Sequence, residues 1–505
     1  MAEGTGHESA TDDGTRSVFG SVSRGAVVTF VGTFVGKALG FGSTAVITNL
    51  AGPPTHGRLS VALSVLTVAL LVTRNGFRDA IVNYVGKARS PAEGLETVIA
   101  SLSMGLGLAI VVGAAMIVFA DEIARTAFSS PGTAVFVRWL GVALPLATLS
   151  ELSLAATRGW NRAVPTNLVN RILFPVVKLV AVSVAVVLAT GDAGIAVAVV
   201  GAYAVVAAAA SVSVLRTVRE RVGNSIRLRL PSRERYATVV TYAAPLVVSS
   251  GAWVLMNRID TLLVGYYGSD TAVSVYAVAF SLATLFQMLN LSAGMLFFNN
   301  VSKLHSLGRL DRIRRLYART TKWMVVGGVP LALLLFGAPV PVLRLFGPQF
   351  GTGELALLVL AVGVGSHVLV GLNGTAVKAF EATRWHLSVQ FTTLVANVVL
   401  NLVLIPRYGI VGAAVATTVA YAASNVAHTS YLYVNAGIRP LDPAFAVVSV
   451  GYVAVGGFLI RSVRPGLAVS LALVAGLFVG YLAVLAGLGL LTLDEVRSVV
   501  REATA

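Results

Sequence analysis

The chain has no cysteine and few charged residues. Without cysteine it cannot form a disulfide, a thiolate metal site or a cysteine nucleophile. Charged residues make up 12% of the 505 residues and hydrophobic residues 56%, whereas soluble domains carry about 25% charged residues. This balance excludes a soluble enzyme, a disordered scaffold and a secreted disulfide domain, and it indicates a protein that crosses a membrane many times.

Motifs of common catalytic and cofactor chemistry are also missing. The sequence contains no phosphate-binding loop ending in Gly-Lys-Ser/Thr, no HExxH and no G-x-S-x-G. The 6 histidines are scattered without the spacing of metal ligands. Every predicted extracytoplasmic loop is short, so a surface active site has little room. We therefore expect no enzymatic activity, no metal and no cofactor.

Apolar segments of membrane-spanning length recur along the whole chain. They predict an all-α, polytopic membrane protein with about 14 transmembrane helices. The segments lie at 25–50, 58–84, 95–120, 134–157, 164–189, 193–215, 237–266, 271–300, 323–346, 354–380, 387–406, 409–433, 443–461 and 466–491.

Basic residues set the orientation. The chain carries a net charge of +16, and in a membrane protein such an excess comes from cytoplasmic loops, so no nucleic-acid partner is needed to explain it. The loops 216–236 and 301–322 are the most basic, which predicts cytoplasmic N and C termini. The stretch 303–322 alternates leucines and arginines at helical spacing and predicts an amphipathic helix on the cytoplasmic membrane surface. We favour a topology anchor there over a docking site for anionic lipid or an enzyme.

A weak internal repeat divides the chain. A shift of 216 residues aligns Asn83 with Asn299 and Lys87 with Lys303, as in two parallel six-helix halves. The predicted domains are a polar tail at 1–24, an N-lobe at 25–215, a basic linker at 216–236, a C-lobe at 237–433, two peripheral helices at 443–491 and a tail at 492–505.

Charged side chains inside the spans are the candidate functional residues. Each charge in hydrocarbon costs about 2.5–3.5 kcal/mol, so it should face a hydrated cavity or a partner. Six cations are the candidate binding residues: Lys37, Arg74, Arg78, Arg171, Lys178 and Arg258. Their spacing along helices predicts a basic pocket, although Arg78 and Arg171 could instead extend to the cytoplasmic headgroups.

Three acids are candidates for gating or ion coupling: Asp79, Asp260 and Glu151. Buried carboxylates can couple transport to H⁺ or Na⁺. We expect Asp260 to pair with Lys37 or Arg74 across the two lobes, either as a gate that opens or as a permanent ion pair. For Glu151 we favour an ion pair with Arg158 or Arg162 over a coupling role.

Two stretches resemble a known family. YAAPLVVSSGAWVLMNRIDTLLVGYYGSDTAVSVYAVAFSLATL at 242–285 resembles the helix 7–8 region of the polysaccharide-biosynthesis flippases of the Wzx type, and IPRYGIVGAAVATTVAYAASN at 405–425 is similar to their helix 11–12 junction. The wider multidrug/oligosaccharidyl-lipid/polysaccharide exporter superfamily shares these motifs.

The resemblance implies a two-lobed transporter in a prokaryotic plasma membrane. It would move a lipid-linked oligosaccharide, on a polyprenyl or dolichyl phosphate, to the outer leaflet by alternating access for polysaccharide or glycoprotein glycan assembly. The cations suit the phosphate, and membrane lipids and glycan-assembly enzymes are the implied partners. A cation-coupled multidrug exporter is the alternative, although it would need more acidic cavity walls. A membrane-embedded glycan polymerase or ligase is a third, less favoured hypothesis.

Overall fold

The computed structural model describes residues 32–128, 130–162, 164–222 and 230–492, together with residues 495 and 497. The described part consists of helices and contains no strand, which confirms the all-α prediction. Twelve of its helices are long and apolar enough to cross a membrane. The protein is therefore a multi-pass membrane protein, while the count of fourteen spans and the orientation of the termini stay predictions.

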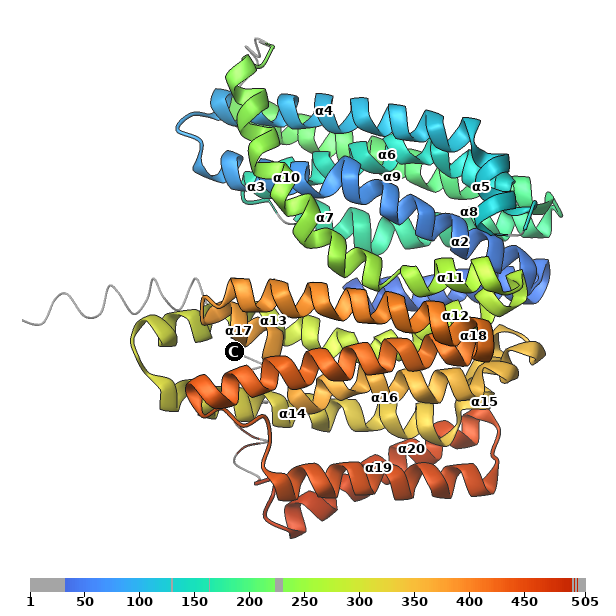
Figure 1. Cartoon of the computed structure of the whole chain (residues 1–505), viewed down its shortest axis with the longest axis vertical. Helices are drawn as coiled ribbons and strands as arrows, with labels where there is room; N and C mark the ends of the chain where they lie inside the picture. Colours follow the sequence, from blue (N-terminus) through green and yellow to red (C-terminus); the bar gives the residue numbers. More distant parts are fainter. Residues whose placement is uncertain are drawn as a thin grey trace, which may run out of the picture.

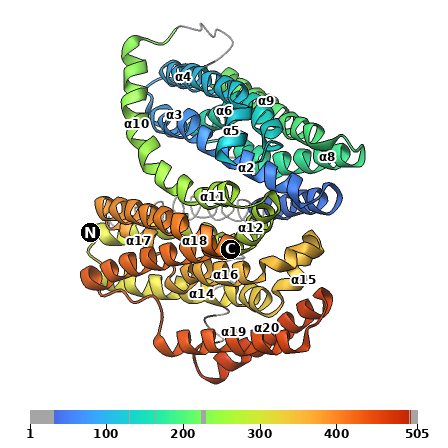
Figure 2. The same ribbon diagram turned by 45° about the vertical axis from the view of Figure 1, so that its right-hand side comes forward.

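The first half of the chain forms one body of packed helices, called the first body, which is the upper one in Figures 1 and 2. Residues 32–46 are helical and continue into a π-helical turn. The elements that follow are η1 (Ile47–Ala51), α2 (Pro53–Leu70), η2 (Leu71–Asn75), α3 (Gly76–Lys87), α4 (Pro91–Val118), α5 (Ala120–Ala127), α6 (Thr133–Gly159), α7 (Val164–Leu168), η3 (Val169–Leu173), α8 (Phe174–Val187) and α9 (Gly191–Val222).

The second half from Ile259 on forms the second body, drawn as the lower one in Figure 1, and its last two helices lie at the outer edge beside α14. The elements of the second half are α10 (Arg233–Met256), α11 (Ile259–Tyr267), α12 (Asp270–Ala283), η4 (Thr284–Phe286), α13 (Gln287–Ser306), α14 (Leu310–Gly337), α15 (Pro339–Leu343), η5 (Arg344–Phe346), η6 (Pro348–Gly353), α16 (Glu354–Val370), α17 (Asn373–Ala379), α18 (Thr383–Ala436), α19 (Pro443–Val463) and α20 (Leu467–Gly487). The first helix of this half, α10, runs along the first body.

The helix α18 contains two predicted spans. It runs for 54 residues and is bent at Gly409, whose φ of 55° and ψ of −134° are not helical. Glycine lacks a Cβ and adopts a positive φ without steric cost. The residue therefore allows the chain to reverse between 387–406 and 409–433 with almost no loop.

The predicted surface helix at 303–322 is wrong. Residues up to Ser306 end α13, and α14 begins at Leu310 and continues without a break to Gly337. Its first turns bury Ile313 and Tyr317 almost completely, and the Tyr317 hydroxyl donates to the Val370 carbonyl. The apolar face of this amphipathic segment therefore packs on protein, where the sequence pattern suggested lipid.

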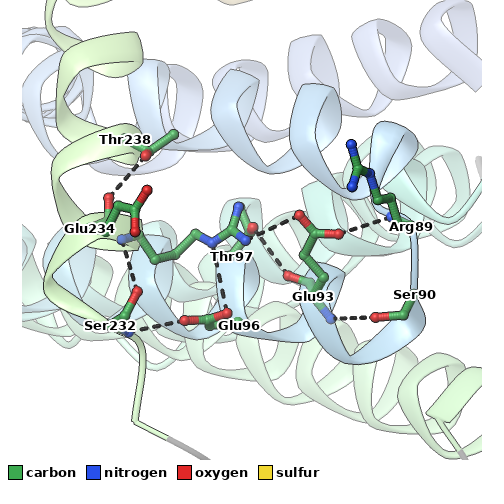
Figure 3. Close-up of polar contacts among 9 residues, drawn as sticks. Arg89, Ser90, Glu93, Glu96, Thr97, Ser232, Glu234 and Thr238 are labelled. Atoms are coloured by element: carbon green, nitrogen blue, oxygen red, sulfur yellow. Dashed lines mark hydrogen bonds and ion pairs between the residues drawn. The ribbon is translucent and has the colours of Figure 1, made fainter.

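The helix α10 connects the two bodies. At its start, Arg235 contacts Glu93 (Nη2 to Oε1, 3.1 Å) and Glu96 (Nε to Oε2, 3.8 Å) of α4, and the Ser232 N–H donates to Glu96 over 3.0 Å (Figure 3). Farther along, α10 and α11 pack against α18. The predicted boundary at residue 237 stays a prediction, and the start of α10 lies on the first body.

Several polar residues occupy breaks in the helices. Arg74 lies in η2, Arg171 in η3 and Thr284 in η4, and Arg258 has the non-helical φ of −126° between α10 and α11. Turns of π or 3₁₀ geometry leave backbone groups unpaired and are frequent at functional sites. We therefore expect a functional site near these breaks, in the interface between the two bodies.

Candidate functional site

One end of the interface between the bodies is closed by Arg58. Its guanidinium contacts Asp192 of the first body and Asp270 of the second body, with N to O distances of 2.7 Å each. The Ser130 hydroxyl also donates to Asp270 over 2.9 Å. The backbones touch here, because a Cβ on Gly57 would lie 1.8 Å from the Asp270 carbonyl oxygen. By the predicted orientation, this is the extracytoplasmic end.

A polar cavity lies next to this closed end. Two of the predicted cations, Lys178 and Arg258, line it from opposite bodies. His56 also lines it, and its Nδ1 is hydrogen-bonded to Ser274 Oγ at 2.8 Å. The other lining residues are Phe41, Ser43, Thr44, Ile47, Leu59, Ser60, Leu63, Ser64, Thr261, Ala277, Val278, Phe280 and Ser281. Two cations among many hydroxyl groups form a site suited to an anion.

Lys37 lies one helical turn from this cavity and reaches across the interface. Its Nζ donates to Thr284 Oγ1 over 3.0 Å and contacts the Thr284 carbonyl oxygen at 3.5 Å. Thr284 follows the cavity residue Ser281 by three positions, on the same helix face. The ammonium group therefore lies beside the cavity, and its hydrogen bonds within the described part of the chain are to neutral oxygen atoms of Thr284.

Arg74 and Glu151 form a separate polar group within the first body. Arg74 Nη1 lies 3.4 Å from Glu151 Oε1, which also accepts a hydrogen bond of 3.2 Å from Asn170 Nδ2. Glu151 therefore pairs with Arg74 and not with the predicted Arg162, which pairs with Glu220. The other predicted partner, Arg158, lies near enough to attract Glu151 electrostatically but forms no close ion pair with it.

Arg78, Asp79 and Arg171 lie apart from the polar cavity. Arg78 Nε and Asp79 Oδ1 are 3.1 Å apart, and both side chains are about one-third exposed. Arg171 packs against the first helix, where a Cβ on Gly36 would lie 2.5 Å from its carbonyl oxygen. The structure therefore brings Lys37, Lys178 and Arg258 together but not all six predicted cations.

Asp260 is buried inside the second body, with 2% of its surface exposed. Its Oδ2 accepts hydrogen bonds from Tyr276 (2.7 Å) and Thr417, and its Oδ1 accepts one from Asn401 Nδ2 (2.6 Å). All three donors are neutral. The expected ion pair with Lys37 or Arg74 is therefore wrong for this conformation, in which both cations have other partners.

The group around Asp260 also contains a polar atom that the described residues do not satisfy. Asn401 Nδ2 donates to Asn397 Oδ1 over 3.1 Å. Asn401 Oδ1 is buried without a hydrogen-bond partner in the described part of the chain, and the Asn397 amide acts on the Asp260 carboxylate. A buried carboxylate, two amides and a threonine hydroxyl supply the oxygen ligands that a hard cation prefers, and the same carboxylate can bind a proton instead.

An apolar groove runs along the second body between α14, α16 and α19. One of its lining residues, Phe286, lies two positions beyond Thr284, the partner of Lys37. The other lining residues are Val325, Gly328, Val329, Ala332, Phe336, Ala361, Val362, Gly365, Ser366, Val368, Leu369, Ser449, Val450 and Val453. The partner of Lys37 and a lining residue of the apolar groove thus both belong to the short turn η4.

Several residues of these sites were not predicted from the sequence as site residues. The pair Asn397 and Asn401 was detectable, because two amides four residues apart in an apolar span share a helix face. Arg58, Asp192 and Asp270 stand at the ends of spans, where charges are ordinary, so only the structure brings them together.

Comparison with known proteins identifies the family. The profile of the polysaccharide biosynthesis protein family matches residues 22–298, and that of the MatE family matches residues 245–406. The probable flippase AglR of Haloferax volcanii is 27% identical over 225 residues, covering 41% of this chain and 44% of that protein. The probable low-salt glycan biosynthesis flippase Agl15 of the same organism is 24% identical, covering 48% and 50%. The chain thus spans about half the length of these relatives.

Solved structures share the fold. The lipid II flippase MurJ in an inward closed conformation has a TM-score of 0.74 at 11% sequence identity, covering 91% of this chain and 98% of that one. An inward-facing multidrug resistance transporter of the MATE family has a TM-score of 0.65 at 14% identity, covering 87% and 100%. Since the first profile spans more than half of the 505 residues, the chain belongs to the polysaccharide biosynthesis protein family.

Proposed function

We propose that the protein flips a lipid-linked oligosaccharide from the cytoplasmic to the outer leaflet of a prokaryotic plasma membrane. The observation that carries this proposal is the polar cavity lined by Lys178 and Arg258 between the two bodies. A separate apolar groove has a lining residue, Phe286, five positions beyond the cavity residue Ser281. A lipid-linked sugar has a phosphate, a polar glycan and an apolar chain, and each of these needs a different environment.

The cations supply the site for the phosphate. Arg258 offers a planar guanidinium that can bind two phosphate oxygens, while Lys178 and Lys37 act as compact charges. Hydroxyl groups such as Ser60 and Ser64 line the rest of the cavity and suit sugar hydroxyls. In this proposal Arg74, Arg78 and Arg171 are not primary ligands of the phosphate in this conformation.

The apolar groove gives the lipid chain a path out of the protein. Its lining includes Phe286, two residues beyond the Lys37 partner Thr284, and residues of the helices α14, α16 and α19. An apolar chain there loses little contact with hydrocarbon while its phosphate remains at the cations. The closed contacts of Arg58 then define one of the two access states, and their opening would release the headgroup to the other side.

Asp260 is the proposed coupling site. Its carboxylate, with Asn397, Asn401 and Thr417, could bind H⁺ or Na⁺. Because α11 carries Asp260 and follows Arg258 directly, ion binding and substrate binding would act on the same helix break. Pairing with glycan-assembly enzymes stays a prediction.

A multidrug exporter is the second candidate. The MatE profile match and the NorM protein of Burkholderia mallei, 30% identical over 203 residues and covering 37% of this chain and 42% of that one, favour it. A cavity lined by two cations would repel the organic cations that such an exporter could carry, so we rank it second.

Proteoliposomes test the two functions directly. The full chain is reconstituted with a fluorescent polyprenyl-diphosphate N-acetylglucosamine, and dithionite quenching reports the probe in the outer leaflet. Lys178→Gln and Arg258→Gln should each slow flipping about tenfold or more, since a hydrogen bond to a charged group contributes about 1.5–3 kcal/mol. Arg125→Gln, a change on the surface helix α5, is the matched control.

Two results would contradict the proposal. Wild-type flipping no faster than in empty liposomes would exclude this class of lipid, and unchanged flipping in both variants would place the phosphate elsewhere. Transport of ethidium without transport of the lipid probe would support the exporter.

A further inference from the structure

A polar stripe runs along the second half of α18. Its residues are Thr417, Tyr421, Ser424, Asn425 and His428, which are all at least 91% buried. Their spacing of four, three, one and three positions places them on one face of the helix. Burying five polar side chains along one transmembrane helix face is costly unless each has a partner or a function.

The inner end of the stripe meets the Asp260 group. The Thr417 hydroxyl donates to Asp260 Oδ2. One turn farther, the Tyr421 hydroxyl lies 3.5 Å from Asn257 Oδ1, three residues before Asp260. The ring of His367 from α16 then packs edge-on against Tyr421, with centroids 4.8 Å apart.

The middle of the stripe is held by amides. Asn425 Nδ2 donates to Ser366 Oγ over 2.9 Å and lies 3.5 Å from His367 Nδ1. From the other side, Asn373 Nδ2 of α17 approaches Asn425 Oδ1 at 3.3 Å. Polar side chains from three helices therefore surround the stripe at this level.

The outer end of the stripe is a pair of histidines. His428 Nε2 and His386 Nδ1 are 3.1 Å apart, and His428 Nδ1 lies 3.3 Å from Ser424 Oγ. His386 is only half-buried, near the start of α18. This end lies beside α17, on the predicted cytoplasmic side (Figure 1). The charged and titratable side chains that act on the pair are Lys378 of α17 and His367 of α16.

We infer that this stripe is the route by which the ion at Asp260 exchanges with the cytoplasm, and that His386 and His428 make this ion a proton. The inference rests on the coupling role proposed for Asp260. Sodium prefers oxygen ligands, whereas an imidazole accepts a proton on one nitrogen and releases one from the other. The proton that leaves the Asp260 carboxyl passes along hydroxyls and intervening water to His428, and the pair delivers a proton to cytoplasmic water.

The lipid-flipping assay tests the route when gradients are imposed. A pH gradient should accelerate flipping by the wild type, and a sodium gradient at equal pH should not. His428→Gln and His386→Gln should lose the acceleration by the pH gradient but keep the undriven flipping rate, because glutamine preserves hydrogen bonding without titrating. Thermal unfolding of each variant checks that it is folded.

His305→Gln is the matched control. This histidine ends α13 at the same side of the membrane, but its ring packs against Phe380, 4.4 Å away between centroids, and lies outside the stripe. It should leave the response to pH intact. Wild-type flipping driven by sodium alone, or an unchanged pH response in both stripe variants, would overturn the proton route and leave the flippase function standing. Wild-type protein that flips no lipid probe would overturn the proposed function, and the inference with it.

Discussion

Removing the Arg58 side chain should open the closed end of the interface. Arg58 is the cation between Asp192 and Asp270, and it joins the two bodies through contacts of 2.7 Å. In Arg58→Ala the link to Asp270 is lost, and two carboxylates are left close to each other without the cation between them. We therefore expect the conformational equilibrium to move away from the state described above.

The size of the shift follows from the contacts. A hydrogen bond to a charged group contributes about 1.5–3 kcal/mol when buried. The side chains of Arg58 and Asp270 are 29% and 18% exposed, so partial screening by water favours the lower figure. Only the contact with Asp270 crosses between the bodies, so the change should be about 1.5 kcal/mol, or about tenfold in the ratio of the two states.

Distances between spin labels measure this ratio. The chain has no native cysteine. A double variant with cysteines at Glu122 and Gln349, both exposed, can therefore carry two spin labels whose distance reports the separation of the bodies at the closed end. Arg58→Ala should add a longer distance, and so should Asp270→Asn. Arg138→Ala is the control, because its 2.7 Å ion pair with Asp121 lies within the first body. An unchanged distance distribution in both interface variants would refute a locking role for Arg58.

Three further predictions concern the backbone and the C-terminal segment. Gly57→Ala should weaken the same closed state in the spin-label assay, since its Cβ would lie 1.8 Å from the Asp270 carbonyl oxygen. Gly409→Ala should lower the unfolding temperature, because a non-glycine residue at this φ and ψ costs about 1–3 kcal/mol; Gly40→Ala, where a Cβ meets nothing within 4 Å, should change it little. Burial alone would raise the pKa of Glu495, but hydrogen bonds from Lys322 and from the Thr492 N–H lower the pKa below its usual value. A lowered pKa means that the contact of Glu495 with Lys322 stabilises the fold above the usual pKa of Glu495 and is lost as pH falls through the lowered pKa. An environment-sensitive dye attached beforehand to Leu491→Cys, at a buried position, should therefore report greater exposure in acid, and already at neutral pH in Lys322→Gln.

The sequence predicted the fold class because the bilayer constrains it strongly. A transmembrane segment must satisfy its own backbone hydrogen bonds, so long apolar runs specify helices. The same rule does not locate breaks within a helix, and the short turns at 71–75, 169–173 and 284–286 were therefore not predicted. The prediction of a surface helix at 303–322 was wrong for a related reason. An amphipathic pattern does not specify whether the apolar face of the helix packs against lipid or against protein.

The candidate site was predicted only in part. Charges in apolar spans drew attention to Lys37, Lys178 and Arg258, which the structure places around one interface. The partners of Asp260 could not be predicted by charge, because neutral tyrosine, threonine and asparagine side chains surround it. Pairing between distant helices depends on their packing, which helical periodicity alone does not determine.

The attachment of α10 at both ends has a mechanical consequence. Its start is fixed to α4 by Arg235, Glu93 and Glu96, while α11 at the other end packs against α18 in the opposite body. If the two bodies move relative to each other during transport, as proposed, the chain must bend at Asn257 and Arg258, between α10 and α11. Arg258 lies at this bend, so the proposed change of access would also move its guanidinium relative to an anion in the polar cavity. Affinity for the cargo would then differ between the two states, as directional transport requires.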